Sequence, residues 1–288
     1  MKTLYLLLGA AAMSGVLFSC AGAPAAGGNT NVVEISDTGE STAKVTVTPE
    51  VHKYTVLRKP ETVVFSYIDG SIDKTVSYEY DDMGRELLSE ETDAQGDVLS
   101  IHKTFYEQGV ISREEDYDAR GLIGITVFET DSDGKIIRQV RQNEEGENVS
   151  FVSYEYDGDF LKTSTAYDSD EIPSLISVYS YRDGELESIE YRLPDGSEDA
   201  RLMRTFENGR VTGEKVVLPD GSVETAREFE YTDGVLSGET QFSGTVKIKS
   251  VHYEYDENGN IIREVWSDRR GHEYEVIERS WLRFEISE

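Results

Sequence analysis

Hydrophobic and polar residues alternate along most of the chain from about residue 50 onward. Before many of the turns, two aromatic residues stand two positions apart, and the residue between them is acidic or small and polar: Tyr78 and Tyr80, Tyr154 and Tyr156, Tyr179 and Tyr181, Phe229 and Tyr231, Tyr253 and Tyr255. A period of two places the rings of each pair on one face of a β-strand. No stretch between turns is long enough for a stable helix. The pattern therefore predicts an all-β protein.

Glycines mark the turns with a period of 25 residues. One series, counted from Gly84, reaches Gly109, Gly134, Asp159 (beside Gly158), Gly184, Gly209, Gly234 and Gly259. A second series, twelve residues later, reaches Gly96, Gly121, Gly146, Glu171, Gly196, Gly221, Val246 and Gly271. Glycine adopts the positive φ that tight hairpins require. Each unit therefore contains two strands and two turns.

This period predicts a repeat domain over residues 50–288. We expect an elongated, twisted and curled antiparallel meander of about nine 25-residue two-strand repeats. The first repeat matches the pattern less closely, and its turn is expected near Lys59 and Pro60. The segment after Gly271 is expected to form a long closing strand in which Trp281 takes the place of a tyrosine. An outer-membrane barrel is disfavoured, because segments such as LLSEETDA (87–94) supply no apolar outer band.

The N-terminal residues carry a processing signal. Lys2 precedes an apolar run from Leu4 to Phe18, which is too short for a membrane-spanning helix. The residues Leu17-Phe18-Ser19-Cys20 resemble the lipobox of bacterial lipoproteins. That resemblance implies that the signal peptide 1–19 is removed and that Cys20 carries lipid, including a fatty acyl chain such as palmitate. The membrane is then a partner through Cys20, and the predicted location is the bacterial cell envelope, at the outer membrane, facing the periplasm or the surface.

Cys20 is the single cysteine of the chain, so no internal disulfide can form. Residues 20–49 are rich in Ala, Gly, Thr and Ser, which predicts a flexible tether after the lipidated cysteine. Within it, the alternating segment 45–48 is a candidate edge strand. Three regions result: the signal peptide 1–19, the lipidated Cys20 with its tether 20–49, and the β-hairpin repeat domain 50–288.

The chain is strongly acidic, with 57 Asp and Glu against 28 Lys and Arg and a formal net charge of −29. Nucleic acid is excluded as a partner, because its phosphates require a basic surface. Acidity of this kind keeps an exposed surface soluble, and it also attracts cations or basic partners.

The repeats carry a family resemblance. YEYDDMGRELLSEETDAQGD (78–97) and YEYDENGNIIREVWSDRRG (253–271) resemble the YD repeats of the RHS family. TFENGRVTGEKVVLPDGS (205–222) and EYTDGVLSGETQFSG (230–244) resemble bacterial MORN-type hairpin repeats. The resemblance covers about residues 60–272. It implies a meander of antiparallel hairpins, which in RHS proteins curls into a hollow shell whose repeats form a casing while another domain carries the activity.

The aromatic pairs are the candidate binding face for a carbohydrate or peptide, because a ring offers flat apolar area with a polar tip. The candidate residues are Tyr154, Tyr156, Tyr179, Tyr181, Phe229, Tyr231, Tyr253 and Tyr255. A row of this kind is also common on the core side of a sheet. Asp131 and Asp133 are weak Ca²⁺ candidates, although Asp and Gly are equally the residues that a hairpin turn prefers.

No catalytic constellation is evident, the histidines are dispersed, and the sequence predicts no cofactor and no metal cluster. The predicted function is that of a lipid-anchored envelope repeat protein acting as a non-enzymatic binding or scaffold module for an envelope or extracellular protein or glycan. The alternative is an immunity- or inhibitor-type protein that caps a partner protein, which the MORN-like units suggest. A hydrolase is the third and least favoured class.

Overall fold

A computed structural model describes residues 54–287, which form a single eighteen-stranded sheet. The strands follow one another along the chain as β1 (Tyr54–Tyr67), β2 (Ile72–Tyr80), β3 (Glu86–Asp93), β4 (Val98–Glu107), β5 (Val110–Asp118), β6 (Gly121–Thr130), β7 (Ile136–Gln142), β8 (Asn148–Asp157), β9 (Phe160–Asp168), β10 (Pro173–Arg182), β11 (Glu185–Arg192), β12 (Glu198–Glu207), β13 (Arg210–Val217), β14 (Val223–Thr232), β15 (Val235–Ser243), β16 (Val246–Tyr255), β17 (Ile261–Asp268) and β18 (Glu273–Ser287). The described residues contain no helix, and so none that could span a membrane. The predicted all-β class and two-strand repeats are confirmed.

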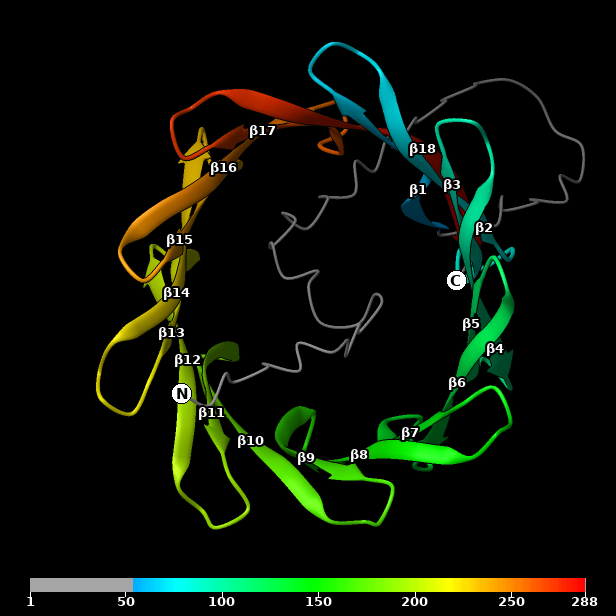
Figure 1. The fold of residues 1–288 in the computed structure, drawn as a ribbon, viewed down its shortest axis with the longest axis vertical. Helices are drawn as coiled ribbons and strands as arrows, with labels where there is room; N and C mark the ends of the chain where they lie inside the picture. The colour runs from blue at the N-terminus through cyan, green and yellow to red at the C-terminus, as the bar shows by residue number, and fades with distance from the viewer. Residues whose placement is uncertain (1–53, 288) are drawn as a thin grey trace, which may run out of the picture. The chain divides into compact units, whose positions relative to one another are not determined.

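The sheet closes into a barrel, because β1 pairs antiparallel with β18 as well as with β2 (Figure 1). The predicted antiparallel meander of hairpins is therefore present in residues 54–287, but it is closed and not elongated. The reason lies in the register. Each pairing of neighbouring strands contains a shift or bulge, as between Glu79 and Tyr80 or between Ser180 and Tyr181. A bulge bends its strand and increases the local twist, so the bends of successive repeats accumulate until the two ends of the sheet meet.

The terminal strands differ from the predicted first and last repeats. The expected turn at Lys59 and Pro60 is wrong, because β1 continues through both residues and only shifts its register between Pro60 and Thr62. A bulge tolerates proline, which has no backbone N–H to donate. The predicted long final strand is confirmed as the 15-residue β18. It pairs with the 14-residue β1 instead of capping an open end.

The turns have the conformations that the glycine series predicts. At Gln108-Gly109 and Asn208-Gly209 both residues have positive φ, as a two-residue type I′ hairpin requires. Gly84 and Gly134 also have positive φ, in longer turns. Glu171, where the second series lacks its glycine, adopts the same left-handed conformation with a φ of 60°.

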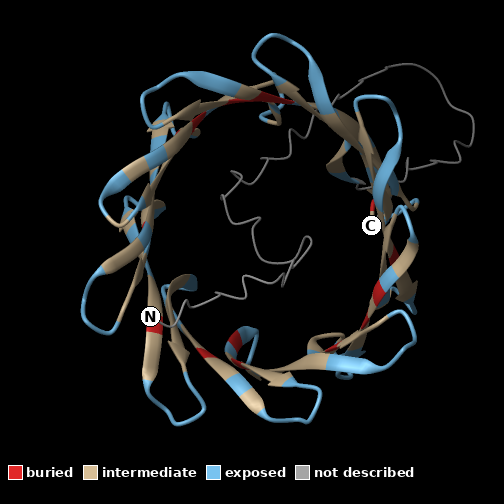
Figure 2. Ribbon diagram, in the orientation of Figure 1, coloured by how far each residue is buried: buried red, intermediate tan, exposed pale blue. Residues whose placement is uncertain are grey.

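The tyrosine-bearing face of the sheet lines the inside of the barrel. Side chains converge on the inner face of a closed sheet and diverge on its outer face. The most buried positions, Val63, Val251 and Thr126 (5, 4 and 4 % exposed), share a face with the tyrosine pairs through the strand register. Buried segments are few and spread around the ring, and the turns are exposed (Figure 2). No large side chain among residues 54–287 is fully buried, as expected for a single-layer sheet.

The outer face is polar over much of its area. Ion pairs such as Glu190 with Arg192 and Glu254 with Arg263, each with a closest N–O distance of 2.6 Å, lie on this face. It also carries an apolar row across β6 to β9, in which the rings of Phe151 and Tyr167 stack at 4.4 Å. Aromatic side chains therefore pack on both faces of the sheet, although the tyrosine pairs lie on the inner one.

At five places, aromatic side chains join a repeat to the one before it. The Tyr156 hydroxyl donates a 2.9 Å hydrogen bond to the carbonyl oxygen of Ile136, about one repeat upstream. The same bond recurs from Tyr80 to Pro60, from Tyr231 to Val211 and from Tyr255 to Leu236. The indole N–H of Trp281 makes it to Ile261 at 3.0 Å, so the predicted equivalence of Trp281 to the tyrosines is confirmed. These bonds lie beside the first-series turns, where the bulges interrupt the regular ladder.

Replacing Tyr80, Tyr156, Tyr231 and Tyr255 by Phe should destabilise the barrel while keeping every ring. Each lost bond should cost roughly 1 kcal/mol, so the quadruple variant should lose about 4 kcal/mol in urea unfolding. The control is Tyr117→Phe, because the Tyr117 hydroxyl bonds the Glu115 carboxylate on the outer face at 2.6 Å. Equal unfolding midpoints for the quadruple variant and the wild type would disprove a role for these bonds.

Candidate functional site

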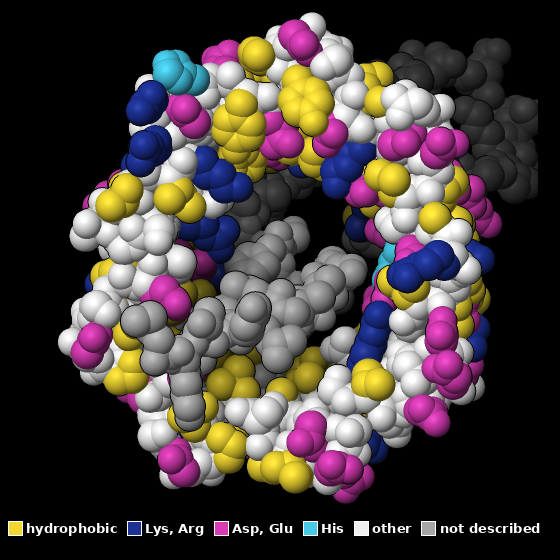
Figure 3. Space-filling model, viewed as in Figure 1, with side chains coloured by type: hydrophobic (Ala, Val, Ile, Leu, Met, Phe, Trp, Pro, Cys, Tyr) yellow, Lys and Arg dark blue, Asp and Glu magenta, His cyan; other side chains and the backbone are white. Residues whose placement is uncertain are grey.

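The inner wall of the barrel contains an uncharged sector rich in tyrosine. Its strands are β8 to β11, and the inward-facing tyrosines are Tyr154, Tyr156, Tyr179, Tyr181 and Tyr191. The other residues in register with them on this face are Ser, Ala, Val, Leu or Ile, with one exception, Asp168 at the end of β9. The Asp168 carboxylate accepts hydrogen bonds from backbone N–H groups in the adjoining turn. We call this the aromatic sector. Figure 3 shows hydrophobic side chains gathered on the inner wall over β8 to β10.

One row of the aromatic sector runs directly across four strands. Tyr154 on β8 lies opposite Ser164 on β9, which lies opposite Ser177 on β10, which in turn lies opposite Tyr191 on β11. Both serines are buried, at 8 % exposed, between the larger rings. The Tyr179 hydroxyl lies 3.2 Å from the Ser164 hydroxyl, and the Tyr154 hydroxyl donates to the Gln139 side chain at 2.8 Å. The rings are thus fixed by their polar tips.

Desolvation favours the neutral form of Tyr154, Tyr181 and Tyr191. It raises the pKa of Tyr154 to about 12, and it also raises the pKa of Tyr191 and of Tyr181 above the ordinary value of 10. The neighbouring phenols add to the shift, because two phenolates side by side would repel. These three phenols therefore add no charge to the aromatic sector at physiological pH.

The predicted binding residues fall into two groups. Tyr154, Tyr156, Tyr179 and Tyr181 lie together in the aromatic sector. The other four predicted residues lie on the inner wall at β14 and β16, among charged groups: Phe229, Tyr231, Tyr253 and Tyr255.

In that second group, charged side chains contact the rings. The Arg227 guanidinium lies 5.7 Å from the centre of the Phe229 ring, and the Tyr253 hydroxyl lies 3.5 Å from a Glu239 carboxylate oxygen. In the first group Lys135, paired with Asp159, lies 5.8 Å from the centre of the Tyr156 ring at the edge of the sector. The structure therefore divides the predicted binding face into a part with few charged neighbours and a part within a charged network.

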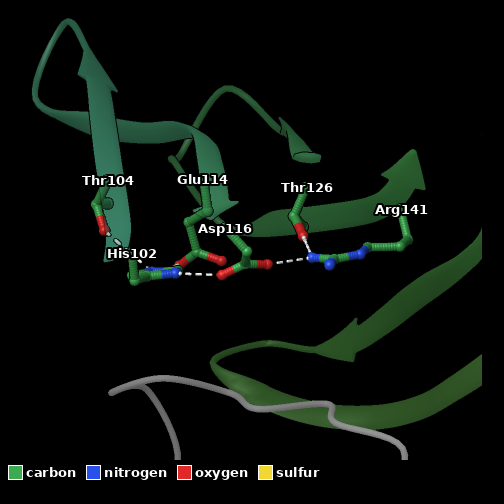
Figure 4. A network of polar contacts seen from close by, with 6 residues as sticks. All are labelled: His102, Thr104, Glu114, Asp116, Thr126 and Arg141. Atoms are coloured by element: carbon green, nitrogen blue, oxygen red, sulfur yellow. Dashed lines mark hydrogen bonds and ion pairs between the residues drawn. The ribbon is translucent and has the colours of Figure 1, made fainter. Parts of the chain in front are cut away.

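A charged network flanks the aromatic sector on the side of β4 to β7 (Figure 4). His102 Nδ1 lies 2.7 Å from Asp116 Oδ1, and His102 Nε2 lies 3.7 Å from Glu114 Oε1. Arg141 donates to the other Asp116 oxygen at 2.5 Å and to the Thr126 hydroxyl at 3.2 Å. The hydrogen bonds that His102 donates to the carboxylates of Asp116 and Glu114 raise the pKa of His102 to about 10. The bond that Asp116 accepts from His102 lowers the pKa of Asp116.

This network ties together β4 to β7, and within it His102 is not available as a general base. A histidine that is protonated at neutral pH and held between two carboxylates cannot accept a further proton. Gly124 makes room for the arrangement, because a Cβ there would lie 2.4 Å from Arg141 Nη2. The network was not predicted from the sequence. His102 and Asp116 each stand seven residues from the turn glycine Gly109, which was the available signal.

A second charged network lies on the opposite flank, from β12 to β18. Glu214 is bonded by Arg204 at 3.1 Å and contacts Arg227, and Arg227 reaches toward Glu239. Further along the wall, Glu264 accepts from Arg279 at 2.7 Å and from the Trp266 indole at 3.0 Å. The buried acids Glu214 and Glu239 directly follow glycines in the two MORN-like segments. They are paired with arginine, as buried charges usually are.

The Ca²⁺ candidates are engaged in their own turn. One oxygen of Asp131 accepts hydrogen bonds from the backbone N–H groups of Asp133 and Lys135, each at 2.9 Å. The same Asx arrangement recurs at Asp81, Asp93 and Asp256. Within residues 54–287, no group of three or more His, Cys, Asp or Glu side chains is placed to hold a metal ion. Cys20, the tether 20–49 and the candidate edge strand 45–48 lie outside the described residues.

Comparisons with known proteins give matches of fold only. No family model matches the chain, and no curated protein matches it in sequence. Among solved structures, it is similar to the TcdB2-TccC3-Cdc42 complex, with a TM-score of 0.39 and 15% identity over 81% of this chain and 15% of that one. The chain thus spans under a sixth of that protein's length.

Two porin-like proteins are also among the similar structures. One, from Bacteroides uniformis, matches with a TM-score of 0.42 and 13% identity, over 77% of this chain and 98% of that one. The other, from Bacteroides vulgatus, has a TM-score of 0.33 and 13% identity, over 77% of this chain and 97% of that one.

His102→Gln should destabilise the protein in a pH-dependent way. Because the folded pKa of about 10 lies above the unfolded 6.5, the protonated ring stabilises the fold fully below pH 6.5, and this contribution is lost as the pH rises toward 10. We expect a loss on the order of 2–4 kcal/mol at pH 6 and under about 1 kcal/mol at pH 9.5, measured by urea unfolding. His252→Gln, at an exposed outer position, should cost less than about 0.5 kcal/mol at either pH. A pH-independent loss for His102→Gln would refute the assignment.

Proposed function

We propose that this protein is a non-enzymatic binding module of the bacterial envelope, anchored by lipid on Cys20, and that it holds its ligand against the inner wall of the barrel. The observation that carries this proposal is the aromatic sector. Its half-buried rings face the lumen, and the charged groups on either side of it are already paired with one another. A surface of this kind offers apolar contact area without a reactive group.

The proposed absence of enzymatic activity rests on the chemistry of the described titratable groups. His102 is held as a cation between two carboxylates, and the buried Glu214 and Glu239 face arginines. A nucleophile or general base needs a free partner at the pH of action. The paired groups of the inner wall are better suited to stiffening a single-layer sheet than to turning over a substrate.

The outer face supports the alternative of a protein that caps a partner. Val127, Val140, Phe151 and Tyr167 lie in register across β6 to β9, and we call them the outer apolar row. Arg138 lies 4.2 Å from the centre of the Phe151 ring, so part of the row is covered by a cation. Rings next to arginine are common in protein interfaces.

Variants of the two faces separate these functions. The lumen variant is Tyr179→Ser with Tyr181→Ser, and the matched outer variant is Phe151→Ser with Tyr167→Ser. Circular dichroism first confirms that each variant is folded. Each full-length protein is then immobilised, and the envelope components that it captures are identified. The wild type and the outer variant should capture a component that the lumen variant does not. Tyr179→Phe with Tyr181→Phe should restore capture, because the rings return. Loss only in the outer variant favours capping, and retention by every variant overturns the lumen proposal.

The lipid anchor has its own test. In a bacterial host, Cys20→Ser should abolish incorporation of labelled palmitate and should release the protein from the membrane fraction, because no other cysteine can accept the lipid. Ser19→Ala, next to the modified position, is the matched control and should leave both properties unchanged. Persistent membrane association of Cys20→Ser without label would disprove anchoring through this residue.

A further inference from the structure

We propose that the aromatic sector binds an uncharged glycan chain laid across strands β8 to β11. This assignment rests on the proposed use of the inner wall as a binding surface and names the chemistry of its ligand. It starts from the row Tyr154, Ser164, Ser177 and Tyr191, in which two short hydroxyl side chains lie between two phenol rings.

The spacing of this row suits a chain of linked sugar rings. Tyr154 and Tyr191 are three strand spacings apart, about 14 Å at about 4.8 Å per spacing. Tyr179 lies between them on β10, with its hydroxyl 3.2 Å from that of Ser164. A sugar presents one apolar face and a rim of hydroxyl groups. The apolar face matches a phenol ring, and the hydroxyl rim matches the Tyr and Gln139 polar groups of the sector. The two serines, each 8 % exposed, are short enough to leave room between the rings.

The charge distribution points to a neutral chain. The protein has a formal net charge of −29, so a polyanion is repelled as it approaches. The residues of the sector that face the lumen are uncharged except for Asp168, whose carboxylate accepts two backbone N–H groups. The nearest cation of the β4 to β7 network, Arg141, is bonded to Asp116. Lys135, which lies 5.8 Å from the centre of the Tyr156 ring, is paired with Asp159. An acidic glycan therefore finds these cations already paired, and the carboxylate of Asp168 stands at the end of β9.

The closed sheet argues against an extended peptide as the ligand. Peptides that bind sheets usually add a strand to an open edge, where unpaired backbone groups supply the affinity. In residues 54–287 the first and last strands, β1 and β18, pair with each other along their length. A peptide in the lumen would therefore leave its own backbone groups without strand partners, whereas a glycan has no backbone amides to satisfy.

The test uses full-length protein and short oligosaccharides of defined charge, with binding measured by calorimetry. The panel contains neutral glucan and mannan oligosaccharides, a uronic-acid oligosaccharide and an apolar peptide. We expect a neutral oligosaccharide to bind. Tyr154→Leu with Tyr191→Leu should weaken that binding roughly tenfold or more, because Leu keeps bulk and loses the flat ring. Tyr154→Phe with Tyr191→Phe should stay within about threefold of wild type, because the rings remain.

The outer control is Phe151→Leu with Tyr167→Leu, which should bind as the wild type does. Preference for the uronic-acid probe or the peptide, no binding of any neutral probe, or equal binding by the Leu variant overturns the glycan assignment. Its failure is distinguishable from failure of the proposed function. If the lumen variant of the capture experiment loses its envelope component while all neutral probes fail here, the lumen function stands and only the glycan is wrong.

Discussion

The pairing of β1 with β18 is the contact on which the rest of the barrel depends. It is antiparallel, runs from Tyr54 opposite Ser287 to Tyr67 opposite Glu275, and joins the two longest strands of the sheet. A single-layer sheet with open ends would present two long edges of unpaired backbone groups. Closure removes both edges. It also defines an inside, and so it turns one face of a repetitive sheet into a wall whose side chains converge.

The wall replaces the hydrophobic core that a single layer cannot form. No large side chain among residues 54–287 is fully buried, so stability comes from the strand ladders and from contacts between neighbouring strands on the inner face. Hydroxyl-to-carbonyl bonds such as Tyr156 to Ile136 act between repeats. Ion pairs such as Glu214 with Arg204 act across a hairpin. Because these contacts are local, one stretch of the wall can be aromatic and uncharged while its neighbours are charged.

This division of the wall gives the functional proposals their physical basis. In the two charged networks, cations and carboxylates already satisfy one another, as at His102 with Asp116 and at Glu264 with Arg279. Breaking such pairs to bind a ligand would cost free energy. In the aromatic sector such a pair, Lys135 with Asp159, lies at the edge beside Tyr156. The phenol tips of Tyr154 and Tyr179 are held by neighbouring groups while the rings line the lumen. An uncharged ligand with flat apolar faces is the one that such a surface accepts at least cost.

Local chemistry determined the elements of this protein, so they were visible in the sequence. The aromatic alternation fixed the strands, and the glycines marked turns such as those at Gly109 and Gly134, where positive φ is required. The aromatic alternation also placed Trp281 at a position equivalent to the tyrosines. The His102–Asp116 pair could have been predicted, since both residues are equidistant from Gly109.

Closure of the sheet could not be predicted from the sequence, because it depends on how the bends of many bulged pairings accumulate over the whole array. Pro60 shows the same limit: proline suggested a turn, but its pairing with the distant β18 kept the strand continuous. Which tyrosines gather in an uncharged sector was likewise decided by the cross-strand register, which places Ser177 between Ser164 and Tyr191.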